Sequence, residues 1–157
     1  MPRTVEGKLI AEGKRFAIVA ARWNSFFGEA LLAGAIEYLV RHGAREEDIT
    51  VYRCPGCYEL PMVADRVAQK GGVDAIICLG ILIRGSTIHF DLIASQAASN
   101  IARVSLDRGL PVSFGVLTCE TLEQTAERSG SKAGNKGAEA AEAAVELVNL
   151  YDAIDNT

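Results

Sequence analysis

The regular alternation of short apolar runs with longer amphipathic stretches is the feature that most constrains this fold. The first run, residues 16–20 (FAIVA), contains no polar residue, as is typical of a strand buried on both faces of a parallel sheet. In the stretch that follows, Phe27, Leu31, Ala35 and Leu39 recur at a spacing of four and therefore share one face of a helix. A buried strand followed directly by an amphipathic helix is thus predicted.

The same strand-then-helix pattern recurs along the chain. Asn24 or Ser25 is expected to cap the first helix, and Gly43 is expected to end it. Further strands are predicted at residues 49–52, 74–80 and 112–116, and further helices at residues 59–70, 90–108, 120–128 and 135–154. This order predicts one α/β domain, residues 1–157, built as a three-layer α/β/α sandwich around a four-stranded parallel sheet, with residues 1–12 as an N-terminal arm.

Charge and hydropathy argue against two classes of partner. The chain carries 16 Lys and Arg against 20 Asp and Glu, and it contains no basic block that would follow a nucleic-acid backbone. No apolar run approaches the roughly 20 residues of a membrane span, and the first residues do not resemble a signal peptide. A cytoplasmic protein without nucleic-acid or membrane partners is predicted, and its cysteines are expected to stay reduced.

Ligands of parallel α/β sheets bind beyond the carboxyl ends of the strands. The loops expected there follow Ala20, Arg53, Gly80 and Val116. Because the unusual residues of the chain gather in these loops, we expect the functional site at this end of the sheet.

The loop expected after the third strand carries the signal for an anion. Ser86 and Thr87 come just before a predicted helix, whose free amides and positive end favour a phosphate. An ordinary helix cap is the alternative for this segment. His89 lies in the first turn of the same helix, where it is close enough to move protons at a bound phosphate.

Two further segments have both a functional and a structural interpretation. Residues 128–137 (RSGSKAGNKG) place three cations around a glycine-rich turn, which suits a dianion, and the alternative is a solvated connection between helices. Trp23 follows the first strand, where a flat heteroaromatic ligand can stack on its indole. The alternative is that Trp23 covers the edge of the strand.

The segment from Cys54 to Cys57 has the spacing of a zinc or thiol redox motif. A zinc site needs about four ligands, and no second pair of cysteines or histidines supplies the others. A redox role for Cys54 and Cys57 remains an alternative. The favoured interpretation is a tight turn at Pro55 and Gly56 that brings backbone amides to a ligand.

Five segments, taken in order, resemble the lumazine synthases of the riboflavin pathway. They are residues 22–24 (RWN), 55–61 (PGCYELP), 80–90 (GILIRGSTIHF), 114–118 (FGVLT) and 134–137 (GNKG). The resemblance covers nearly the whole chain and implies a flavodoxin-like fold. It also implies a transferase that condenses 5-amino-6-(D-ribitylamino)uracil with 3,4-dihydroxy-2-butanone 4-phosphate, without a metal or an organic cofactor.

The resemblance also assigns residues to roles. It implies that His89 donates a proton, Trp23 stacks on the pyrimidine, and Phe114 covers the ring. The remaining site residues implied are Asn24, Cys57, Tyr58 and Glu59 on the substrate and its ribityl chain, Ile81, Leu82 and Ile83 on the uracil, Ser86, Thr87 and Arg128 on the phosphate, and Lys136 as a further positive charge. In the family, Phe114, Arg128 and Lys136 would come from the adjacent subunit.

The family forms homo-oligomers, and the resemblance implies a pentamer. Residues 130–134 (GSKAG) resemble the kink of shell-forming members, so a 60-subunit icosahedral shell is favoured over the bare pentamer. Residues 5–10 are expected either to add a strand to a neighbour's sheet or to form a disordered arm. Riboflavin is a further candidate ligand.

Three positions depart from the commonest family pattern: Trp23 stands where phenylalanine is frequent, Ser86 where alanine is usual, and Cys57 where serine or alanine is typical. The first two keep stacking and amide donation, whereas a thiol is a poorer partner for ribityl hydroxyls. The alternative functions are a flavin-binding or shell-forming protein that has lost catalysis, and the thiol redox protein.

Overall fold

The computed structural model describes residues 1–84, 88–130 and 134–157. Its strands are β1 (Phe16–Ala21), β2 (Ile49–Cys54), β3 (Ala75–Ile83) and β4 (Val112–Cys119). They form one four-stranded sheet in the order β2-β1-β3-β4, and every neighbouring pair is parallel. The predicted four-stranded parallel sheet is therefore confirmed.

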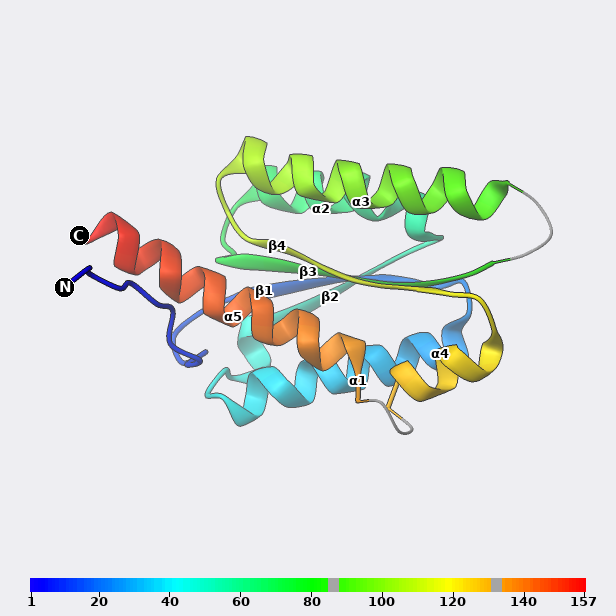
Figure 1. The fold of residues 1–157 in the computed structure, drawn as a ribbon. Coiled ribbons are helices and arrows are strands. Elements are labelled where there is room, and N and C mark those ends of the chain that lie inside the picture. Colours follow the sequence, from blue (N-terminus) through cyan, green and yellow to red (C-terminus); the bar gives the residue numbers. More distant parts are fainter. Residues whose placement is uncertain (85–87, 131–133) are drawn as a thin grey trace.

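Helices cover both faces of this sheet, as Figure 1 shows. The helices are α1 (Ser25–Arg41), α2 (Leu60–Lys70), α3 (His89–Arg108), α4 (Leu122–Arg128) and α5 (Lys136–Asp155), with short 3-10 turns η1 (Glu46–Asp48) and η2 (Cys57–Glu59). In Figure 1, α2 and α3 lie on one side of the sheet, and α1, α4 and α5 lie on the other. The predicted three-layer α/β/α arrangement is therefore confirmed.

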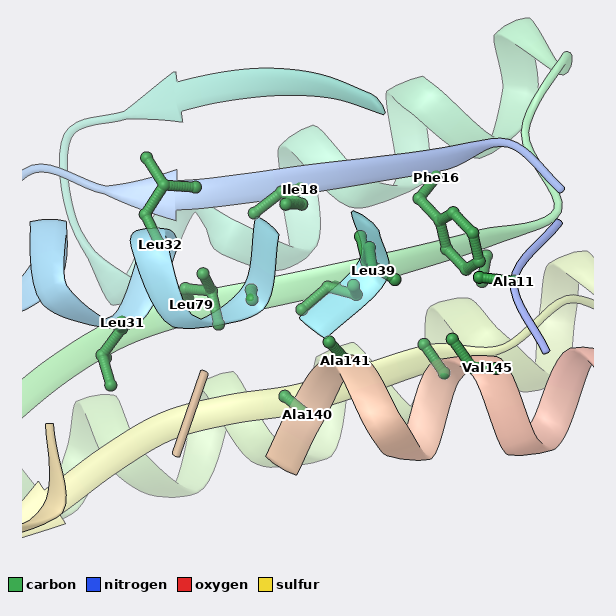
Figure 2. Close-up of a cluster of buried hydrophobic side chains, with 14 of the residues drawn as sticks. Ala11, Phe16, Ile18, Leu31, Leu32, Leu39, Leu79, Ala140, Ala141 and Val145 are labelled. Carbon is green, nitrogen blue, oxygen red and sulfur yellow. The ribbon is translucent and has the colours of Figure 1, made fainter. Parts of the chain in front are cut away.

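Each face of the sheet has its own apolar core. On the α1 and α5 side, Leu31, Ala35 and Leu39 are fully buried against the sheet, and Phe27 packs beside them. Figure 2 shows Leu31 and Leu39 among side chains from the sheet and α5. The spacing of four in the sequence therefore marks the buried face of α1, as predicted.

All four strands run past their predicted ends, and β3 and β4 do so by the most. The predicted strands end at Gly80 and Val116, but β3 continues to Ile83 and β4 to Cys119. The two strands stay paired over this extension, up to the pair Ile83 and Cys119. The prediction that residues 81–83 form a loop was wrong, because the partner strand rather than the local composition sets where pairing stops.

The start of α1 also differs from expectation. Asn24 occupies the cap position, but its backbone is left-handed (φ 61°) and its side chain makes no capping hydrogen bond. The amide Nδ2 instead donates to the carbonyl of Ile81, 3.3 Å away on β3. A long-range hydrogen bond has replaced the predicted local cap.

The first 15 residues contain no helix or strand, and residues 8–14 run beside the C-terminal part of α5. In Figure 1 both termini lie on the same side of the molecule. The Asn149 amide donates to the carbonyls of Lys8 and Ile10, and Lys14 pairs with Asp152. The pairing of residues 5–10 with a neighbouring subunit stays a prediction. No helix in the described ranges is long and apolar enough to cross a membrane.

Candidate functional site

The sheet order creates a crevice between β1 and β3. Strand β1 pairs with β2 along one edge and with β3 along the other, so the chain leaves β1 and β3 in opposite directions, and ligands of such sheets bind at this point. A cavity of about 570 Å³ lies here, a size typical of small-molecule sites. We call it the switch-point pocket; it is lined by Trp23, Asn24, Gly56, Cys57, Tyr58, Glu59, Ile81, Leu82, Ile83, His89 and Ile93.

Most of the site residues expected from the sequence meet in this pocket. Trp23 and Asn24 follow β1, and residues 57–59 form the turn between β2 and α2. Residues 81–83 end β3, and His89 begins α3. Three segments that are far apart in the sequence are therefore brought together by the carboxyl ends of adjacent strands.

Trp23 forms an exposed aromatic platform at the mouth of the pocket. Its side chain is 71% exposed, which is unusual for an indole without a ligand or partner. Backbone hydrogen bonds from Arg22 to Cys54 and from Trp23 to Pro55 hold the platform against the next loop. The indole lies so close to Gly56 that a Cβ there would come within 2.8 Å of Trp23 Cδ1. Gly56 is thus the residue that lets the two loops approach.

The free edge of β3 offers backbone groups to the pocket. Pairing between β1 and β3 ends at Leu79, whereas β3 runs on to Ile83. The Ile81 carbonyl on this edge already accepts from Asn24 Nδ2, and the Cys57 thiol donates to it over 3.8 Å. Ile83, two residues further, directs its backbone groups to the same edge. On this edge, which faces away from β4, no strand of the described sheet pairs with Ile83.

The pocket combines groups that suit a polar heteroaromatic ligand. The indole offers a stacking face, Glu59 a hydrogen-bond acceptor, and His89 a proton carrier. His89 is exposed on the first turn of α3. Such a set can hold a flat ring and move protons at its rim, which is acid–base chemistry.

The thiols do not have the properties of a redox pair. Burial, reinforced by Glu59, raises the pKa of Cys54 to about 11, and burial raises the pKa of Cys57 to about 12. Reactive thiols have lowered pKa values, because the thiolate is the nucleophile. Among the described residues, all four cysteines are free and no cluster of His, Cys, Asp and Glu is able to hold a metal.

Three further expected site residues lie elsewhere. Phe114, Arg128 and Lys136 line a second cavity of about 430 Å³ on the outer strand of the sheet, together with Val116, Leu117, Thr118 and Glu139. We call it the β4 pocket. In the part of the chain that the structure describes, neither Arg128 nor Lys136 forms an ion pair with another side chain. The two cations are therefore available to an anion.

Close packing on either side of Lys136 fixes the position of this residue at the start of α5. Asn135 caps the helix by accepting from the Ala138 amide, and its own amide donates to the carbonyls of Ala30 and Ser129. A Cβ on Gly137 would come within 2.0 Å of the Leu31 carbonyl oxygen, so only glycine allows this approach to α1. The asparagine and the second glycine of the GNKG segment thus anchor the lysine.

Ser86 and Thr87, expected to bind phosphate, lie outside the described residues, as does most of the 130–134 segment. Sequence reasoning missed Ile93 of the switch-point pocket and Glu139 of the β4 pocket. Helical spacing would have found both residues. Ile93 follows His89 by four positions and Glu139 follows Lys136 by three, so each shares a helix face with an expected site residue.

Comparison with known proteins supports a single family. The sequence model of 6,7-dimethyl-8-ribityllumazine synthase matches residues 13–152. A protein of that name from Chlorobium limicola is 60% identical over 149 residues, 95% of this chain and 96% of the relative. Proteins of the same name from Chloroherpeton thalassium and Desulfatibacillum aliphaticivorans are 55% and 54% identical, over 95% and 97% of this chain and 96% and 98% of their own lengths. The chain belongs to the 6,7-dimethyl-8-ribityllumazine synthase family.

Proposed function

We propose that this chain, acting as a single domain, condenses 5-amino-6-(D-ribitylamino)uracil with 3,4-dihydroxy-2-butanone 4-phosphate to give 6,7-dimethyl-8-ribityllumazine, phosphate and water. The observation that carries the proposal is the switch-point pocket, in which an exposed indole, a carboxylate and an imidazole line one cavity. Imine formation, phosphate elimination and ring closure need positioned reactants and a proton carrier more than a strong nucleophile. The names of the relatives support the same product.

The switch-point pocket would bind the pyrimidine substrate. Trp23 stacks on the ring, and Ile81 to Ile83 meet the uracil through their backbone, chiefly along the open edge at Ile83. Asn24, Cys57, Tyr58 and Glu59 line the ribityl side, where Glu59 accepts from hydroxyl groups. Support comes from the gathering of these residues around one cavity.

The β4 pocket would complete the site from a neighbouring subunit. Arg128, with Ser86 and Thr87 of the first subunit, binds the phosphate, while Lys136 adds positive charge and Phe114 covers the ring. Support comes from the separation of the two pockets on one chain: the described residues that line one pocket do not line the other. His89 then protonates the leaving phosphate.

This arrangement requires a ring of subunits, and we propose a pentamer. A heterologous contact of this kind closes when the rotation between neighbours returns to the start. We further propose that pentamers assemble into a 60-subunit shell, on the basis of the GSKAG segment at residues 130–134. Sedimentation analysis separates the two assemblies, because a bare pentamer has one-twelfth of the mass of the shell.

The direct test is to incubate the protein with both substrates and to record the absorbance of the lumazine product. Product formation that depends on both substrates is the expected result. Absence of product at any pH near neutrality would reject the proposed enzymatic activity. Ligand binding without turnover would support the alternative of a binding protein on the same scaffold. Riboflavin serves as the probe for that binding measurement.

A further inference from the structure

Arg84 joins three structural elements beside the switch-point pocket. It is the first residue after β3, and its backbone amide donates to the Cys119 carbonyl at the end of β4 (2.8 Å). Its guanidinium pairs with Glu120, which follows β4, and with Asp91 in the first turn of α3, both at 3.1 Å. The same group lies 4.5 Å from the centre of the Phe90 ring.

These contacts act as one unit. The side chains of Arg84, Asp91 and Glu120 are 40%, 60% and 60% exposed, and a single exposed ion pair contributes little. A planar guanidinium, however, can hold two carboxylates with different edges while its face rests on an aromatic ring. Removing Arg84 would release all three partners at once and leave Asp91 and Glu120 without their shared cation.

This unit lies directly beside His89, the proposed proton donor. Phe90 and Asp91 directly follow His89, the residue with which α3 begins. His89 and Ile93, one turn apart, both line the switch-point pocket. The orientation of the first turn of α3 therefore determines where the His89 ring lies in the pocket, and Arg84 ties this turn to the ends of β3 and β4.

We propose that Arg84 is a positioning residue, which fixes the first turn of α3 through Asp91 and Phe90 so that His89 is held in the geometry of proton transfer. The inference rests on the proposed function of His89 as proton donor. Arg84 does not itself contact the pyrimidine, since it does not belong to the residues that line the pocket.

Steady-state kinetics of Arg84→Gln test this role. Because small misplacements of a reacting group have large effects on rate, kcat should fall by about tenfold or more. The Michaelis constant for ribitylaminouracil should stay within about twofold, since Trp23 and Glu59 are unchanged. Arg84→Lys keeps the charge but not the planar fork, and its kcat should lie between those of Arg84→Gln and the wild type.

The same helix supplies a matched control. Arg108 at the other end of α3 forms an ion pair with Asp65 at 2.8 Å, and its side chain is about as exposed as that of Arg84. Arg108→Gln should therefore leave kcat unchanged. Amide hydrogen exchange gives a readout that does not depend on activity: residues 88–95 should exchange faster in Arg84→Gln than in the wild type or in Arg108→Gln.

A double-mutant cycle completes the test. Arg84→Gln combined with Asp91→Asn should lose no more activity than the more impaired single variant, because both changes break one unit. The inference is overturned by a kcat of Arg84→Gln within about twofold of the wild type, by an equal loss in Arg108→Gln, or by additive effects in the cycle. Should Arg84→Gln not assemble, Arg84→Lys and Asp91→Asn carry the same comparison. A wild-type protein that forms no lumazine overturns the proposed function and this inference together.

Discussion

The switch-point pocket and the β4 pocket of one chain differ in their position in the sheet and in the charge of the residues that line them. The first lies between two central strands and contains an aromatic platform, a carboxylate and an imidazole. The second lies on the outer strand and contains Arg128, Lys136 and a half-buried Phe114. One is suited to a flat polar ring, and the other to an anion with an aromatic cover.

The difference shows what each pocket lacks. A stacked ring is desolvated only when its second face is also covered, and a phosphate dianion binds best with a fixed cation beside it. In the switch-point pocket neither an arginine nor a lysine belongs to the described lining. A second copy of the chain that presents its β4 pocket would supply both the cover and the cation.

The largest effect on activity is expected when one residue of each pocket is replaced, which tests whether the two pockets form one site. His89→Ala and Arg128→Ala should each lower kcat by about 10²-fold or more, because each removes a group that we propose to act in the transition state. After co-expression, a site is intact when its switch-point pocket comes from an Arg128 variant and its β4 pocket from a His89 variant. Random mixing around a ring makes about a quarter of sites intact, so activity should recover toward a quarter of wild type.

The control for this experiment is a mixture of the two variants after separate assembly, which should remain inactive. Recovery after co-expression that does not exceed the mean of the two variants would show that each chain holds its own complete site. In that case the β4 pocket would not complete the switch-point pocket of a neighbouring subunit.

A smaller effect is expected from Trp23, which tests the switch-point pocket alone. Trp23→Ala should weaken binding of the pyrimidine substrate by about tenfold, because the stacking surface is lost, and Trp23→Phe should keep most of it. Because Trp23 is the sole tryptophan, bound lumazine or riboflavin should quench its emission in a saturable titration. Normal ligand affinity in Trp23→Ala would mean that the indole only covers the edge of the strand.

Gly56→Ala should weaken binding of the pyrimidine substrate by about threefold, since the new methyl group displaces the indole rather than removing it. The backbone of Gly56 is extended (φ −154°), so alanine is tolerated there and the indole takes the strain. Gly28→Ala in α1 is the matched control, because its Cβ would meet only the Ala21 carbonyl at 3.8 Å. Equal affinities in both variants would contradict the role assigned to Gly56.

The smallest effect is expected from the cysteines. Replacing Cys54 and Cys57 together by serine should leave the rate of lumazine formation within about twofold, because neither thiol takes part in the chemistry. With pKa values raised to about 11 and about 12 by burial, both thiols stay protonated near neutral pH. Their alkylation at pH 8, followed by mass spectrometry, should be slower in the folded than in the unfolded chain by about 10²-fold for Cys54 and about 10³-fold for Cys57. Loss of function in the double variant would instead favour the redox protein.

Much of the fold could be read from the sequence because the signals are local. The buried face of α1 follows from the spacing of Leu31, Ala35 and Leu39, and glycines mark the ends of helices, as at Gly109 after α3. The loops that carry Trp23 and His89 of the switch-point pocket could also be predicted, since they follow strand ends of a parallel sheet, whereas most other members of the pocket were implied by the family resemblance. The helix features depend only on residues that are neighbours along the chain or one helical turn apart.

Other features depended on the tertiary structure. The extensions of β3 and β4 exist because the two strands continue to pair with each other, and the left-handed Asn24 is held by a carbonyl on β3. The family resemblance assigns Phe114, Arg128 and Lys136 to an adjacent subunit, and on the folded chain these three residues line a pocket of their own. Only the folded chain brings Arg84 to Asp91 and Glu120. The periodicity, the turns and the residue types in the loops could be read from the chain alone. Strand length and the contacts of Arg84 arise between residues brought together by the sheet order, which local sequence does not encode.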